Sequence, residues 1–193
     1  MKAIIIGNAS SILNHKNGNI INNFDKVIRL NKFVIKGFED YVGTKTDIYC
    51  SKILNMSYNI NLLNDIENVW FPYPKPPRWW KTKGNFKEIA QEKCDMYIKE
   101  YNIKHFSYLN EEKTKEIEEI FKYVCQPSTG LIAIMMAIQE LPNYKLYYTG
   151  FDNFMTGWYW DTSHNCIKNM QNSILFEKIF LNKIETKYNI KKI

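Results

Sequence analysis

The sequence predicts an α/β sandwich, in which helices cover a mostly parallel sheet, folded as one Rossmann-like domain over residues 1–193. Short and continuously apolar stretches, of which residues 2–6 are the first, are typical of parallel strands buried on both faces. Helix-like stretches separate these strands, as parallel connections require. At 193 residues with 45% hydrophobic side chains, the chain can bury a single core.

Four strands are expected in the first part of the chain. They cover residues 2–6, residues 24–31, the second part of residues 41–51, where a turn precedes the strand, and the region around residues 69–71. A short helix is expected over residues 58–66. Gly7 and Asn8 follow the first strand at once. A strand that ends in Gly and small polar residues is where open α/β sheets bind nucleotides, and a tight strand-to-helix turn uses the same residues. The segment is neither GxGxxG nor a P-loop.

Residues 72–124 are expected to interrupt the α/β pattern as a helical and loop insert, or lid. Residues 72–84 are rich in proline, aromatic and basic residues and indicate a loop. Helices are expected over residues 86–101 and 110–124, with a strand over 104–109 between them. The loop aromatics suit stacking on a sugar or base, contact with a membrane, or packing on one another.

The stretch from residue 126 to residue 152 is expected to organise the fold. Ser128 or Thr129 is a natural N-cap for the apolar run that follows, which predicts a helix buried on most sides. Residues 144–149 indicate a strand that Gly150 ends. A helix N-terminus with hydroxyl groups beside a strand end is suited to an anion, and an ordinary capped core helix has the same residues.

A closing helix is expected over residues 165–188, directly after His164, and the last residues form a short basic tail. The expected apolar face of this helix consists of Ile167, Met170, Ile174, Leu175, Ile179 and Ile184.

The composition limits the classes of partner and compartment. The net charge of +6 and pI near 9.0 suit an anionic ligand, an acidic membrane surface or nucleic acid. No nucleic-acid partner is expected, because no nucleic-acid-binding module is recognisable and the lysines are scattered. The four cysteines form no CxxC pair, so no metal site is expected. Without a signal peptide or a long apolar run, the expected location is cytoplasmic.

Four blocks occur in a characteristic order: residues 5–11, residues 24–31 with 41–46, residues 127–130 leading to 148–152, and finally His164. This order resembles the sialyltransferase superfamily, both the bacterial lipooligosaccharide sialyltransferases and the animal enzymes with sialyl motifs. The resemblance implies a variant GT-A fold and an inverting transfer of sialic acid, or a related nonulosonate, from a CMP-sugar to a glycan hydroxyl. It implies no metal or other cofactor. It also implies lipooligosaccharide or capsule synthesis, with peripheral contact at the inner face of the membrane.

The resemblance also implies roles for individual residues. His164 would be the general base, and histidine can take the acceptor's proton near neutral pH. Tyr159 resembles a phosphate-binding tyrosine, and Asp152 and Asp161 could either orient His164 or cap local turns. The residues expected to bind the nucleotide or the donor are Gly7, Asn8, Ser10, Asn31, Ser128, Thr129, Gly130, Asp152 and Tyr159.

Two departures from the family pattern keep alternatives open. Phe154 stands where the bacterial enzymes have a second phosphate-binding tyrosine, and Asn169 stands where the animal motif has a glutamate, while Glu177 lies farther on. Both departures are compatible with a non-catalytic nucleotide- or glycan-binding domain. A CMP-Kdo-type transferase is the other alternative, because motifs that bind CMP do not read the sugar.

Overall fold

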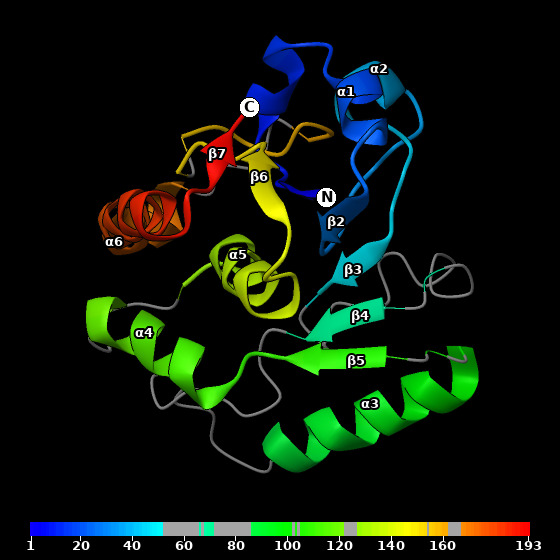
Figure 1. Cartoon of the computed structure of the whole chain (residues 1–193), viewed down its shortest axis with the longest axis vertical. Helices are drawn as coiled ribbons and strands as arrows, with labels where there is room; N and C mark the ends of the chain where they lie inside the picture. Colours follow the sequence, from blue (N-terminus) through cyan, green and yellow to red (C-terminus); the bar gives the residue numbers. More distant parts are fainter. Residues whose placement is uncertain are drawn as a thin grey trace.

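A computed structural model describes residues 1–51, 66, 68–71, 86–101, 103, 105–121, 127–153, 155–161 and 167–193. Within these residues, seven parallel strands form one sheet in the order β5-β4-β3-β2-β1-β6-β7 (Figure 1). The strands are β1 (Lys2–Ile6), β2 (Lys26–Leu30), β3 (Ile48–Cys50), β4 (Asn68–Phe71), β5 (His105–Tyr108), β6 (Lys145–Thr149) and β7 (Lys191–Lys192). The single α/β domain and the parallel sheet that the sequence predicts are confirmed.

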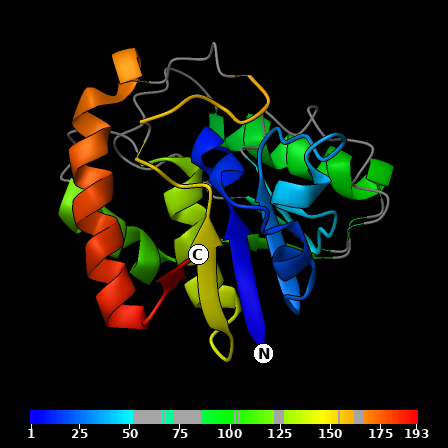
Figure 2. The same ribbon diagram turned by 90° about the horizontal axis from the view of Figure 1, so that it is seen from above.

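Helices cover both faces of the sheet (Figures 1 and 2). On one face, α4, α5 and α6 pack over the apolar side chains of β1, β2 and β3. On the other face, η1, α1 and α2 cover β1 and β2, and α3 covers β3 and β4. The helices are η1 (Ser10–Asn14), α1 (Gly18–Asn22), α2 (Glu39–Val42), α3 (Phe86–Tyr101), α4 (Glu111–Phe121), α5 (Thr129–Glu140) and α6 (Ile167–Tyr188). None of the helices in the described part of the chain is long and apolar enough to cross a bilayer.

The described part of residues 72–124 does not interrupt the α/β pattern, which corrects the sequence-based expectation. Helix α3 connects β4 to β5, and β5 pairs in parallel with β4 from His105 to Tyr108. This is an ordinary parallel crossover that adds an edge strand to the main sheet. The proline-rich loop and most of the expected helix over residues 58–66 lie outside the described residues, so a lid role for that loop stays a prediction.

The face that helix α6 turns to the core matches the predicted one only in part. Ile184 is buried as predicted, but Leu175 and Ile179 are 61% and 48% exposed, and Phe180, which the predicted face does not include, is fully buried. Phe180 lies against Phe121 of α4, with ring centroids 5.9 Å apart. Apolar residues occur on both sides of this helix, so aromatic packing against α4 decides which side faces inward.

The end of the chain is also more ordered than a basic tail. Lys191 and Lys192 form β7, which pairs in parallel with β6. The hydroxyl of Thr149 donates to the carbonyl of Ile193 at 2.9 Å. These bonds fix the last strand on the outer edge of β6.

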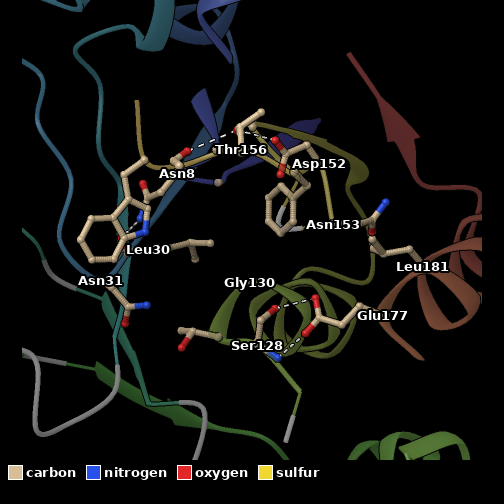
Figure 3. A pocket seen from close by; sticks show the side chains of 17 residues that line it. Asn8, Leu30, Asn31, Ser128, Gly130, Asp152, Asn153, Thr156, Glu177 and Leu181 are labelled. Carbon is tan, nitrogen blue, oxygen red and sulfur yellow. Dashed lines mark hydrogen bonds between the residues drawn. The ribbon is translucent and has the colours of Figure 1, made fainter. Parts of the chain in front are cut away.

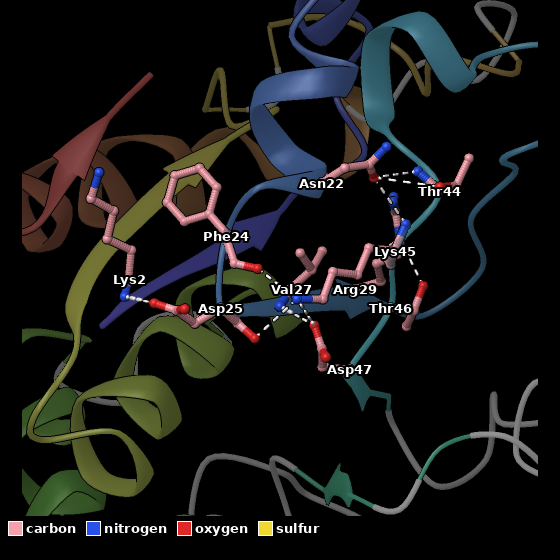
Figure 4. A network of polar contacts seen from close by, with 10 residues as sticks. All are labelled: Lys2, Asn22, Phe24, Asp25, Val27, Arg29, Thr44, Lys45, Thr46 and Asp47. Atoms are coloured by element: carbon pink, nitrogen blue, oxygen red, sulfur yellow. Dashed lines mark hydrogen bonds and ion pairs between the residues drawn. The ribbon is translucent and has the colours of Figure 1, made fainter.

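Arg29 of β2 is a buried cation that holds the segment between α2 and β3 (Figure 4). Its side chain is 1% exposed. Nε donates to the carbonyl of Lys45 and the hydroxyl of Thr46, both at 3.0 Å, and Nη2 donates to the carbonyls of Val42 and Gly43 at 2.7 and 3.1 Å. Burial lowers the pKa of Arg29 to about 10. Because this value is still well above 7, the guanidinium remains charged at neutral pH.

Replacing Arg29 with methionine should lower the free energy of unfolding by about 3 kcal/mol, because it leaves the buried carbonyls of this segment without donors. Urea unfolding followed by circular dichroism measures the change. Lys36→Met serves as the control, because Lys36 is exposed and its loss should change stability by less than about 0.5 kcal/mol. Equal stability of the two variants would contradict the structural role of Arg29.

Candidate functional site

A pocket of about 150 Å³ lies where the carboxyl ends of β1, β2 and β6 meet the N-terminus of α5 (Figure 3). The chain runs outward from β1 to β5 on one side and continues with β6 and β7 on the other, so the pocket lies where the strand order reverses. Open parallel sheets bind ligands at this position. The lining residues are Gly7, Asn8, Ala9, Leu30, Asn31, Ser128, Thr129, Gly130, Gly150, Phe151, Asp152, Asn153, Thr156, Gly157, Trp158, Glu177 and Leu181.

Glycines let the segments after β1 and β6 approach each other closely. Gly7 N–H donates to the carbonyl of Thr149 at 2.8 Å, and Ala9 N–H donates to that of Gly150 at 3.0 Å. A Cβ on Gly7 would lie 2.2 Å from the Gly150 carbonyl oxygen, and one on Gly130 would lie 2.5 Å from the Phe151 ring. Gly7 and Gly130 are therefore required by packing, whatever they contribute to a ligand.

Asn8 fixes the β1 end of the pocket to the β2 end. Its Nδ2 donates to the carbonyls of Leu30 and Lys32 at 3.1 and 3.0 Å. Because both partners are carbonyls, the orientation of the amide is determined, and Asn8 Oδ1 is left as a buried acceptor without a partner in the described residues.

A second acceptor lies in the segment after β6. One carboxylate oxygen of Asp152 accepts from the Thr156 hydroxyl, while Oδ1 is buried and has no partner in the described structure. Asn8 and Asp152 are thus suited to ligand groups that donate hydrogen bonds, such as hydroxyl or amino groups.

The opposite side of the pocket is the N-terminus of α5 (Figure 3). Ser128 is the N-cap, as the sequence predicts, and its Oγ accepts from Leu131 N–H at 3.2 Å. Residues 129–137 of the helix are all buried, which confirms the expected core helix. Backbone N–H groups in the first turn of a helix have no partner within the helix and can bind an anionic group.

Glu177 of α6 lines the pocket, although neither its local sequence nor the family resemblance indicates a role for it. It is 3% exposed and accepts from both the backbone N–H and the hydroxyl of Ser128, the latter at 2.9 Å. Burial raises the pKa of Glu177 to about 7, although both hydrogen bonds act against that shift. Glu177 shares the buried face of α6 with Phe180 and Ile184, where an acidic residue is unusual, but periodicity alone does not show which face of this helix is buried.

The pocket brings together most of the residues that the resemblance selected. Those that line it are Gly7, Asn8, Asn31, Ser128, Thr129, Gly130 and Asp152. Ser10 and Tyr159 do not belong to the lining. Ser10 N–H contacts Thr156 and Gly157, and the buried Tyr159 hydroxyl donates to the carbonyl of Val34 at 2.6 Å and accepts from its N–H at 3.0 Å.

His164 and Phe154 lie outside the described residues, so the position of the expected general base stays a prediction. The binding roles of the lining residues stay predictions as well. Among the described residues, no three His, Cys, Asp or Glu side chains cluster closely enough to hold a metal ion.

Comparison with known proteins gives the family. The model of glycosyltransferase family 29 (sialyltransferase) matches residues 1–188. Human alpha-N-acetylgalactosaminide alpha-2,6-sialyltransferase 2 is 24% identical over 204 residues, which cover 91% of this chain and 53% of the human protein. The chain therefore spans about half the length of this curated relative.

Solved structures support the fold. A mammalian sialyltransferase in complex with Gal-beta-1-3GalNAc-ortho-nitrophenol matches with a TM-score of 0.63 and 18% identity, covering 100% of this chain and 68% of that one. The sialyltransferase CST-II, in complex with a trisaccharide acceptor and CMP, matches with a TM-score of 0.63 and 20% identity, covering 100% and 79%. At these identities the likeness establishes the fold.

Replacing Gly150 with alanine should lower the free energy of unfolding by about 2–4 kcal/mol, because it combines backbone strain with a clash. Gly150 has φ +71° and a Cβ there would lie 2.5 Å from the Gly7 carbonyl oxygen. Gly37→Ala is the matched control, because Gly37 has φ +87° and no atom within 4 Å of a Cβ. The control should lose only about 1 kcal/mol in chemical unfolding. Similar losses in the two variants would show that the contact with Gly7 is unimportant.

Proposed function

This chain belongs to glycosyltransferase family 29, the sialyltransferases, and we propose that it transfers sialic acid, or a related nonulosonate, from a CMP-sugar to a glycan hydroxyl. The observation that carries the proposal is the pocket at the strand-order reversal, which gathers residues from three of the sequence blocks that resemble the family. The sialyltransferase CST-II, which has the same fold, forms a complex with CMP.

The polarity of the pocket supports a nucleotide donor. The unpartnered acceptors of Asn8 and Asp152 suit the hydroxyl groups of a ribose or the amino group of a cytosine. The first-turn N–H groups and the Thr129 hydroxyl at the N-terminus of α5 suit acceptor atoms and negative charge on the same ligand. Leu30 and Phe151 add apolar surface for a base or a sugar ring.

The proposed reaction inverts the anomeric centre and needs no metal. The acceptor hydroxyl oxygen attacks the anomeric carbon, the bond from that carbon to the phosphate oxygen breaks, and CMP leaves with the electron pair. His164 takes the proton of the acceptor hydroxyl. Hydrogen-bond donors of the pocket stabilise the charge on the departing phosphate.

The biological setting is proposed from the resemblance to the bacterial lipooligosaccharide enzymes. The acceptor would be a lipooligosaccharide or capsule glycan, modified in the cytoplasm at the inner face of the membrane. Peripheral membrane contact would then bring the enzyme to its acceptor, and the excess of positive charge suits an anionic surface.

The test is release of CMP from CMP-sialic acid in the presence of EDTA. Wild-type turnover should survive EDTA, and His164→Ala should reduce it by about 10² or more, because the base no longer removes the acceptor's proton. His15→Ala is the control, since His15 is exposed and has no proposed role. Loss of wild-type turnover in EDTA that added metal restores would contradict the metal-free mechanism.

The same assay separates the alternatives. Release from CMP-Kdo and not from CMP-sialic acid would assign a different donor to the same kind of enzyme. Binding of CMP without release from either donor would indicate a non-catalytic domain, the alternative that Asn169 in place of the glutamate favours.

A further inference from the structure

Glu177 is a buried carboxylate inside the pocket that the proposed reaction does not use (Figure 3). Both of its oxygens accept hydrogen bonds from Ser128, one from the backbone N–H and one from the hydroxyl. No cation within the described structure pairs with it. An ionised carboxylate that is buried with neutral partners is unfavourable. Burial therefore raises the pKa of Glu177 to about 7, so its carboxyl group can be protonated near neutral pH.

When Glu177 is ionised, Ser128 donates both of its hydrogens to this carboxylate. The Ser128 Oγ also accepts from Leu131 N–H. The N-terminus of α5 then offers a ligand only the N–H groups of Thr129 and Gly130 and the Thr129 hydroxyl, next to a resident negative charge. That charge opposes the approach of an anionic ligand.

Protonation of Glu177 removes this negative charge and changes the hydrogen bonds of Ser128. The protonated carboxyl can donate its O–H to Ser128 Oγ while its other oxygen still accepts from the Ser128 N–H. Ser128 Oγ then accepts two hydrogen bonds, and its own hydrogen can point to a ligand. A single proton therefore removes a negative charge and adds a donor at the same point of the pocket.

We propose that Glu177 is a positioning residue that sets, through Ser128, the donors which the N-terminus of α5 presents, and that it takes up a proton when the anionic nucleotide-sugar binds. This inference rests on the proposed function, because it takes the ligand to be a CMP-sugar with a phosphodiester and a carboxylate. Glu177 would thus make donor binding depend on pH without touching the reacting atoms.

Few other charged groups face Glu177 in the described residues. Asp152 is the other titratable side chain of the pocket lining. The first turn of α5 contains no acidic residue. On α4, which packs against α6, Glu116 is paired with Lys187 at 2.8 Å. Farther along α6, Glu185 accepts from a tyrosine hydroxyl of β6.

Isothermal titration calorimetry with the 3-fluoro analogue of CMP-sialic acid tests the inference. The phosphodiester and carboxylate of this analogue keep their charges between pH 6 and 8. The dissociation constant of the wild type should rise about tenfold over that interval, as expected for a bound state that requires one proton on a group with pKa near 7. Titrations in two buffers of different ionisation enthalpy should show uptake of more than half a proton near pH 7.5.

Three variants identify the group responsible. Glu177→Gln, which resembles the protonated side chain, should bind equally well across this pH range and without proton uptake. Ser128→Ala should weaken binding more at pH 6 than at pH 8, because at pH 8 the hydroxyl already donates to Glu177. Glu185→Gln, two turns farther along the same helix, should keep the wild-type pH dependence.

The outcomes distinguish this inference from the proposed function. Tight binding that does not change with pH, or wild-type pH dependence in Glu177→Gln, would overturn the role of Glu177 and leave the donor assignment intact. Equal weakening of Ser128→Ala at both pH values would overturn the route through Ser128. Failure of the wild type to bind the analogue at any pH would overturn both proposals. If Glu177→Gln does not fold, proton uptake by the wild type decides alone.

Discussion

The close approach of the Gly7 and Gly150 backbones determines where the site lies. β1 and β6 are direct neighbours in the sheet, with Ile6 opposite Thr149, and the two glycines extend this contact past the ends of both strands. A side chain at either position would separate the two segments. Because the contact lies where the strand order reverses, it aligns Asn8 and Asp152 along one wall of the same pocket. Any ligand site at this edge depends on that contact.

The opposite wall depends on how α5 is packed. Its first nine residues, 129–137, are buried, so the sheet beneath it and α6 beside it fix the position of its N-terminus. Gly130 allows the ring of Phe151 to lie against the helix, which joins α5 to the segment after β6. Glu177 joins the same N-terminus to α6 through Ser128. The cap of one helix, the segment after a strand and a buried acid on a second helix thus form one connected unit.

The sequence predicts those parts of this molecule that local patterns determine. Continuous apolar runs predict β1 and β2, and the Ser128 cap with its apolar run predicts α5, because short-range burial and capping are sufficient there. The sequence predicts a strand at β5 but not its pairing with β4, because contacts between residues far apart in the chain determine which strands pair. The inward face of α6 could not be chosen from periodicity, since Leu175 and Phe180 are both apolar. The bonding of the Tyr159 hydroxyl to Val34 depends on a contact between segments far apart in the chain.

Two buried ionisable groups show how the same physical effect has different consequences on the two faces of the sheet. Burial lowers the pKa of Arg29 to about 10, which is still far above neutral, so Arg29 is charged in both the folded and the unfolded chain at pH 7 and its contribution to stability does not vary there. Burial raises the pKa of Glu177 from 4.5 to about 7. The folded chain therefore binds this proton more tightly than the unfolded chain, and the contribution of Glu177 to stability is greatest below pH 4.5 and declines as pH rises through 7. Any ligand that favours the protonated form reduces that loss, so binding at the pocket and folding are linked through the same carboxyl group.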